Sequence, residues 1–218
     1  QVSRALSQAQ WPQASDEIWA GFVRAFEFDS ELEESLISGT YRGDYGEFGD
    51  LAAYAHAVSH MTVAQTVARA GGPINVLPSS GELELDIRTL PGQSDDDVDR
   101  AITEALGELA EHVTIERLLS ERATASSIET KLYRTIEEVL REAHPGAVVV
   151  PILFPGGSDL RVGRRKGGVG YGFGSCASGA TLGEVYSQLH AHDEHMPIED
   201  VASTARELER LVRLYIGE

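Results

Sequence analysis

The chain has 218 residues, enough for one large domain or two modest ones, and 42% of them are hydrophobic, an ordinary share for a globular core. Its formal net charge of -17 argues against a nucleic-acid backbone or an anionic membrane surface as partner, because both would repel it. The single cysteine, Cys176, rules out a disulfide within the chain, and no apolar run approaches the length of a membrane span. We therefore expect a cytoplasmic protein that binds neither nucleic acid nor membrane.

The first 57 residues are predicted to be mainly helical. Pro12 ends a first helix, and Ser15 is a suitable N-cap for the next one. Short helices are expected over 29–37 and 51–56, with a loop rich in Gly, Tyr and Asp between them. Aromatic side chains are frequent throughout this stretch. They either roof a ligand site or, as burial preferences favour, form a core.

A small α+β module is predicted to follow. β-Favouring residues over 62–67 form one strand, which Gly71-Gly72-Pro73 ends. Apolar and charged residues alternate over 82–88, as in a strand with one buried face. Ser94 then caps a helix whose first turn holds three aspartates, and residues 113–119 form a third strand. This order is typical of helices that cover one face of an antiparallel sheet.

The last hundred residues have the pattern of an α/β domain. A helix over 128–140 is followed by two apolar segments, 147–154 and 168–174, which predict strands buried on both faces. A closing helix is expected to turn five apolar residues inward: Val201, Leu208, Leu211, Val212 and Tyr215. The join to the preceding module falls near 120–126.

Two segments of this second part carry candidate chemistry. Between His190 and His195 lie three imidazoles and two carboxylates, ligand types that Zn²⁺ accepts. The alternative is a solvated polar loop ahead of the closing helix, whose first turn would hold Glu199 and Asp200. The Gly-rich turn over 155–159 follows a predicted buried strand, where exposed amides can receive a carboxylate or phosphate. A plain tight turn uses the same residues.

Three stretches, taken in order, resemble a known family. They are residues 75–78 (Asn-Val-Leu-Pro) with 85–88 (Leu-Asp-Ile-Arg), then 156–159 (Gly-Gly-Ser-Asp), then His190 with Glu194 four positions later. This order is similar to that of the dinuclear zinc metallopeptidases that include aminoacylase, glutamate carboxypeptidase, acetylornithine deacetylase and succinyl-diaminopimelate desuccinylase. The resemblance runs from about Val58 to the end of the chain. It implies a catalytic α/β domain with two zinc ions, or cobalt or manganese in their place, and an inserted α+β lid that makes a homodimer through its sheet edge.

The resemblance implies one metal ligand in this chain. His190 falls on the family's last zinc ligand, four positions before the glutamate. His192 and His195 fall on no ligand position and are expected to be solvated or to support the ligands from outside. The family's other zinc ligands and its general base belong upstream of Gln1, and so do its lid histidine and first lid strand. No catalytic residue is therefore assigned here, and the chain alone is expected to be inactive.

The resemblance also implies substrate contacts. Asn75 and Arg88 fall on lid residues that contact substrate, where an amide can donate to the scissile carbonyl and a guanidinium can fork onto a carboxylate. For Arg88 the alternative is a surface pair with Asp86, on the same strand face. The turn residues match the loop that shapes the pocket for the substrate's free carboxylate: Gly156, Gly157 and Ser158.

These expectations combine into one domain scheme and one function. Residues 1–121 form the lid or dimerisation domain, with a helical insertion over 10–57, and residues 122–218 form the C-terminal half of the catalytic domain. The whole protein is expected to cleave the amide bond of N-acyl amino acids or of small peptides with a free carboxylate. The alternative is a non-catalytic homologue that dimerises or binds a ligand after loss of its metal centre.

Overall fold

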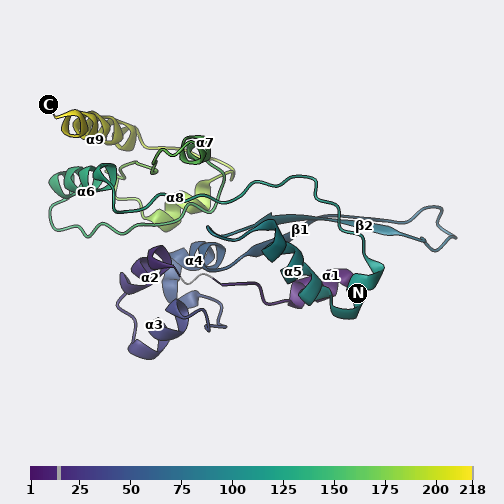
Figure 1. Ribbon diagram of the computed structural model, residues 1–218. Helices are drawn as coiled ribbons and strands as arrows, with labels where there is room; N and C mark the ends of the chain where they lie inside the picture. Colours follow the sequence, from purple (N-terminus) through teal and green to yellow (C-terminus); the bar gives the residue numbers. More distant parts are fainter. Residues whose placement is uncertain (14–15, 218) are drawn as a thin grey trace. The chain divides into compact units, whose positions relative to one another are not determined.

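The structure is a computed structural model that describes residues 1–13 and 16–217, and it divides into two compact units (Figure 1). The first unit comprises Gln1–Ala14 and Ala57–Ala123, and the second comprises Ser15–His56 and Thr124–Glu218. The boundary after Ala123 falls within the predicted join. Most of the predicted helical insertion over 10–57, namely Ser15–His56, belongs to the second unit. The assignment of the two units as lid and catalytic domain remains a prediction.

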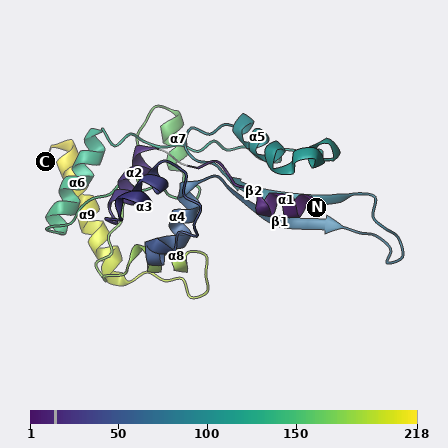
Figure 2. The same cartoon turned by 90° about the horizontal axis from the view of Figure 1, so that it is seen from below.

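The first unit is built on a β-hairpin, as predicted. Strand β1 (Thr62–Ala70) pairs antiparallel with β2 (Gly81–Arg88), and one register shift falls between Gln65 and Val67. Helices α1 (Val2–Gln8) and α5 (Asp95–Leu106) pack on one face of this hairpin (Figure 2). Their shared core consists of Leu6, Ile102 and Leu106, with Leu83, Leu85 and Ile87 of β2 against it. The predicted half-buried strand and the helices on one sheet face are thus confirmed.

The predicted third strand, over 113–119, is not formed. After α5 the chain enters the 3-10 helix η2 (Gly107–His112) and then runs without strand pairing. Arg117 in this segment pairs with Asp99 of α5 at 2.6 Å. Side-chain contacts with the acidic side of α5, and not a backbone ladder, therefore hold this segment.

The N-terminal part of the second unit has an aromatic core, which confirms the packing interpretation of these residues. It contains α2 (Glu17–Arg24), α3 (Ser30–Ile37), η1 (Gly46–Leu51) and the first part of α4 (Ala52–Ser59), up to His56. The rings of Phe22 and Phe48 stack with centroids 5.6 Å apart, and the Trp19 indole N–H donates to the Leu36 carbonyl at 2.8 Å. Asp16 caps α2 through the Trp19 amide, while the predicted cap Ser15 lies outside the described residues.

The C-terminal part of this unit is organised by a helix pair. Helix α6 (Lys131–Ala143) packs on α9 (Ile198–Ile216) through Ile136, Val139 and Leu211. Only part of the predicted inward face of α9 is buried. Leu211 is 6% exposed, but Val201, Leu208, Val212 and Tyr215 are exposed. The prediction was wrong for Val201, Leu208 and Val212, which form a second apolar face on α9, whereas the ring of Tyr215, although exposed, lies 4.6 Å from Lys131 Nζ of α6.

The two predicted buried strands of this unit are not formed either. Residues 147–154 and 168–174 form no strand and have no ladder partners among the described residues, and Val148 is 85% exposed. A strand needs hydrogen-bonding neighbours, and the described residues supply none for these two segments. Tyr171 and Phe173 nevertheless pack against the core between α6 and α9. Short helices α7 (Leu160–Arg165) and α8 (Leu182–Gln188) follow these segments. The fold is α+β, and its sheet is the antiparallel hairpin.

Candidate functional site

Asn75 lies in the loop at the far end of the β1–β2 hairpin (Figure 1). The loop turns through a hydrogen bond from the Val76 amide to the Pro73 carbonyl at 2.9 Å. Asn75 is exposed, and the neighbouring Ile74 and Leu77 project almost fully into solvent. Apolar side chains this exposed at a loop tip are typical of a surface that another molecule covers.

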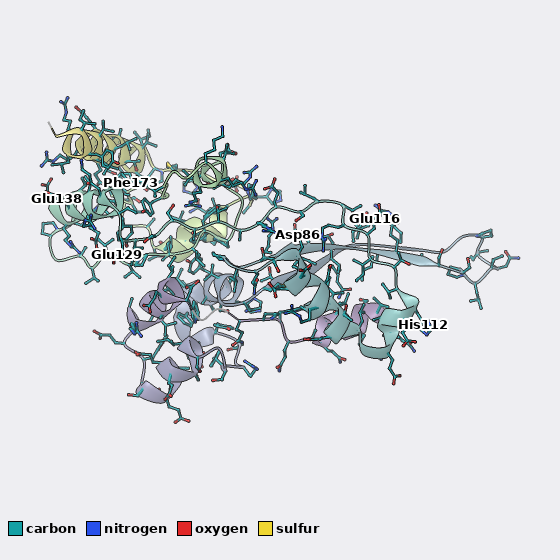
Figure 3. All side chains as sticks on the ribbon, in the orientation of Figure 1. Asp86, His112, Glu116, Glu129, Glu138 and Phe173 are labelled. Carbon is teal, nitrogen blue, oxygen red and sulfur yellow. The ribbon has the colours of Figure 1, made fainter. Side chains whose placement is uncertain are left out.

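Arg88 ends β2 and binds Asp86, whose place on the first unit is marked in Figure 3. Its Nε donates to Asp86 Oδ1 at 2.6 Å, and its Nη2 donates to Oδ2 at 2.9 Å. This is the surface pair that the sequence offered as the alternative for Arg88. The Arg88 side chain is 56% exposed, so the pair leaves it accessible to solvent.

Asn75 and Arg88 are not brought together within one chain. Strand β2 runs for eight residues from Gly81, next to the loop, to Arg88, a span of roughly 25 Å at the rise of an extended strand. A small substrate cannot meet both side chains of the same hairpin. Their substrate roles remain predictions, and the geometry restricts how the two can act on one molecule.

The Gly156–Ser158 turn lies directly before α7. A Cβ at Gly156 would lie 2.8 Å from Cε1 of the Phe154 ring, so a larger residue here would displace that ring. The Leu160 amide donates to Ser158 Oγ at 3.2 Å, and Arg161 Nη1 donates to the Ser158 carbonyl at 3.0 Å. The turn is therefore ordered by its own side chains and leaves Gly157 exposed.

His190 lies in an exposed loop after α8. Its backbone is left-handed (φ 59°), an uncommon conformation for a residue with a Cβ, and its amide donates to Glu194 Oε2 at 3.2 Å. His195 Nδ1 lies 2.8 Å from the Asp193 carbonyl. Among residues 1–13 and 16–217, no three His, Cys, Asp or Glu side chains are grouped so that they could hold a metal ion. The donor set among the described residues is thus incomplete for a metal centre.

Arg164 is a structural residue that the sequence did not single out. Its Nε donates to Ser126 Oγ at 3.0 Å, its Nη1 to the Thr124 carbonyl at 3.2 Å and its Nη2 to the Gly170 carbonyl at 2.5 Å. These bonds tie α7, and with it the Gly-rich turn, to the start of the C-terminal segment. A single arginine among basic neighbours gives no sequence signal for such a role.

The sequence did not single out Tyr54, which is buried, or Tyr186, which is half-buried. Burial raises the pKa of both phenols above the ordinary value. The Cys176 thiol pKa is also raised, first by burial and then by the Asp200 carboxylate, which disfavours a reactive thiolate.

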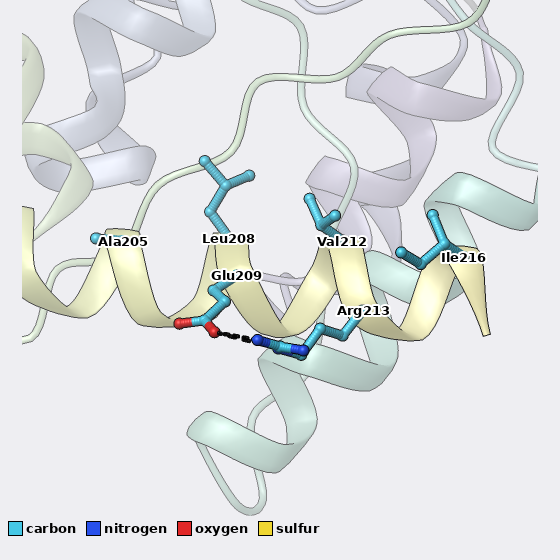
Figure 4. Close-up of a pocket in the computed structure, with 6 residues that line it drawn as sticks. All are labelled: Ala205, Leu208, Glu209, Val212, Arg213 and Ile216. Carbon is cyan, nitrogen blue, oxygen red and sulfur yellow. Dashed lines mark hydrogen bonds and ion pairs between the residues drawn. The ribbon is translucent and has the colours of Figure 1, made fainter. Parts of the chain in front are cut away.

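A shallow apolar groove of about 490 Å³ lies along the second apolar face of α9 (Figure 4). An ion pair between Glu209 and Arg213 at 2.9 Å forms part of its lining. The groove contains neither His190 nor the Gly-rich turn. Within the described residues no helix is both long and apolar enough to cross a membrane.

Comparison with known proteins accounts for the hairpin and its loop. Residues 3–114, just over half of the chain, match the family model of the peptidase dimerisation domain of M20 peptidases. Over 107 residues the chain is 25% identical to a probable carboxypeptidase S-like 2 of Dictyostelium discoideum. The matched region covers 48% of this chain and 20% of that protein. Its fold is similar to an M20 family metallo-carboxypeptidase, Sso-CP2, from Sulfolobus solfataricus, with a TM-score of 0.55 and 17% identity over 98% of this chain and 48% of that one. The chain thus spans about half of the structural neighbour and a fifth of the curated relative, and it belongs to the M20 peptidase family.

Proposed function

We propose that the protein to which this chain belongs is a metal-dependent amidohydrolase that cleaves N-acyl amino acids or small peptides with a free carboxylate. The observation that carries this proposal is the family match over residues 3–114, which includes both Asn75 and Arg88. The names of both relatives describe carboxypeptidases, which favours a hydrolase over the non-catalytic homologue. A free carboxylate on the substrate suits the planar donor fork of Arg88.

The metal in this proposal is zinc, in two ions, with cobalt or manganese as alternatives. His190 would supply one imidazole, and its exposed position after α8 leaves it open to further ligands. One ligand cannot hold the ion, because a protein zinc site takes about four ligands, of which at least three come from the protein. The chain on its own is therefore proposed to be inactive, since its described residues do not complete a metal site.

A homodimer is the third part of the proposal. The matched family model is that of a dimerisation domain, and Asn75 and Arg88 lie at opposite ends of one strand. If both contact the same small substrate, they must come from two chains. Exposed apolar residues beside Asn75 suit a loop that reaches over a second subunit.

The experiment is a hydrolysis assay of the full-length protein with an N-acetyl amino acid and with its carboxamide analogue. We expect cleavage of the free acid only, loss of cleavage after dialysis against a chelator, and recovery when zinc is restored. Equal cleavage of the acid and the carboxamide would contradict the carboxylate specificity. Full activity without any bound metal would contradict the metal-dependent mechanism.

A further inference from the structure

The segment over 15–56 lies inside the dimerisation-domain match, yet it belongs to the compact unit that contains the Gly-rich turn and His190. Figures 1 and 2 show α4 beside α8, the helix that leads to His190. The contacts within this unit explain the grouping. They converge on Tyr54, in the first turn of α4, which is 5% exposed.

Tyr54 contacts two segments that are distant in the sequence. Its hydroxyl donates to the Leu153 carbonyl at 2.7 Å, and its ring stacks on the ring of Tyr186 with centroids 5.1 Å apart and an interplanar angle of 29°. Leu153 lies three residues before Gly156, and Tyr186 lies four residues before His190. One buried side chain thus connects the stretches that lead into both candidate site segments.

The bond to Leu153 has particular weight because residues 147–154 are in no sheet. A strand in a ladder is fixed by its neighbours, whereas this stretch must be fixed by individual contacts. The phenol is buried, so its O–H needs an acceptor, and the Leu153 carbonyl supplies one. Breaking this bond would leave a buried polar group without a partner and release the backbone ahead of the turn.

A second close contact fixes α8 against η1, the 3-10 helix directly before α4. A Cβ at Gly183 would lie 2.6 Å from Asp50 Cβ and 2.9 Å from the Asp50 carbonyl oxygen. Only glycine therefore allows α8 to approach η1 this closely. Together with the Tyr54–Tyr186 stack, this contact fixes the position of α8, which leads into the His190 loop.

We propose that Tyr54 is a positioning residue that fixes the Gly156–Ser158 turn and the His190 loop relative to each other. This proposal rests on the proposed function for those two segments. Its hydroxyl positions the turn through Leu153, and its ring positions the loop through Tyr186. The helical segment over 15–56 then supports the structure of the site and contributes no reacting group to it.

The test separates the two contacts in the full-length holoprotein. Tyr54→Phe removes the hydroxyl and keeps the ring, so KM for the N-acyl amino acid should rise about three- to tenfold while kcat and metal content stay near the parent values. Tyr54→Leu also removes the stack and should lower metal content and kcat as well. Tyr41→Phe is the matched control, since the Tyr41 hydroxyl donates to Glu47 within the same segment. It should change none of these quantities.

Hydrogen–deuterium exchange provides a readout that does not depend on activity. Tyr54→Phe should speed amide exchange over 153–160, and Tyr54→Leu should speed it over 153–160 and 186–192, while α6 and α9 keep their protection. These changes in a protein without hydrolase activity would support the positioning role and overturn the proposed function alone. Unchanged exchange in both segments, or an equal KM effect from Tyr41→Phe, would overturn the positioning role.

Discussion

The Arg88 guanidinium binds the Asp86 carboxylate through two hydrogen bonds, of 2.6 and 2.9 Å, on the exposed surface at the end of β2. An exposed pair of this kind contributes little to stability. The pair has the same two-point hydrogen-bonded geometry that Arg88 would use to bind a substrate carboxylate. The guanidinium can therefore release Asp86 and bind a ligand carboxylate with a small loss of stability.

The first prediction tests that exchange in the full-length enzyme. Arg88→Lys keeps the charge and loses the planar fork, so kcat/KM for an N-acyl amino acid should fall about ten- to a hundredfold with metal content unchanged. Asp86→Asn is the control, because it removes the competing carboxylate and leaves Arg88 in place. Parent-like hydrolysis of the free acid by Arg88→Lys would show that Arg88 is only the surface partner of Asp86.

The local pattern predicted well wherever neighbouring residues decide the structure. Alternation over 82–88 predicted β2, and Ser94 with its three following aspartates predicted the start of α5. The prediction of strands over 147–154 and 168–174 was wrong, because an apolar run indicates burial and not which strand will pair with it. A strand forms only where a partner is present.

In the candidate site too, local motifs could be predicted from the sequence, but contacts between distant segments could not. Motifs located the turn, His190 and Arg88, but spacing could not tell that Asn75 and Arg88 lie at opposite ends of one strand. Tyr54 gave no signal at all, since its partner Leu153 is distant in the sequence and accepts through its backbone. A backbone acceptor is available at any residue type, so no sequence pattern marks such a contact.

The second prediction concerns metal. His190→Ala in the full-length protein should lose about one zinc per chain and most activity, because a ligand removed from a small coordination shell is not easily replaced. His192→Ala is the matched control from the same exposed loop and should keep both. Metal is measured by mass spectrometry of the dialysed protein. Full zinc occupancy with normal turnover in His190→Ala would remove His190 from the metal site.

The third prediction separates the two apolar faces of α9. Leu211 is 6% exposed and packs against α6, so Leu211→Ala should lower the unfolding free energy by about 2–5 kcal/mol. Leu208 is 46% exposed on the second face, and Leu208→Ala should cost less than about 1 kcal/mol in this chain. Urea denaturation of the 218-residue chain measures both. Equal losses would show that the second face is buried in solution.

The fourth prediction follows from the N-cap of α5. Hydrogen bonds from the Ser94 hydroxyl and amide lower the pKa of Asp97, with a smaller contribution from Arg100. Because the folded-state pKa is depressed, the stabilisation is present above the ordinary carboxyl pKa of about 4 and is lost as the pH falls through the lower folded value. The difference in Tm between the parent and Asp97→Asn should therefore be largest near neutral pH and shrink below about pH 4. Asp96→Asn, one position away, should show a smaller difference.

The fifth prediction uses the separation of Asn75 and Arg88 to test the dimer. Asn75→Ala and Arg88→Ala should each lose activity as separate homodimers. If the two residues serve one substrate from two subunits, a mixed dimer contains one intact site and one site that lacks both side chains. Random exchange of subunits puts about half of all dimers in the mixed form, so activity should recover to about a quarter of the parent value.

The outcome depends on unfolding and refolding the two variants together so that their subunits exchange. A second pair of variants, Asn75→Ala mixed with the inactive His190→Ala, is measured in the same assay. Parent protein taken through the same refolding gives the reference activity. If both residues acted from the same chain, every site in an Asn75→Ala and Arg88→Ala mixture would keep one defect, and no activity would return. A monomeric mass by light scattering at micromolar concentration would contradict the dimer independently of any activity. Recovery near a quarter, in a protein of dimeric mass, would place the Asn75 loop of one subunit over the Arg88 end of the other, as the length of β2 requires.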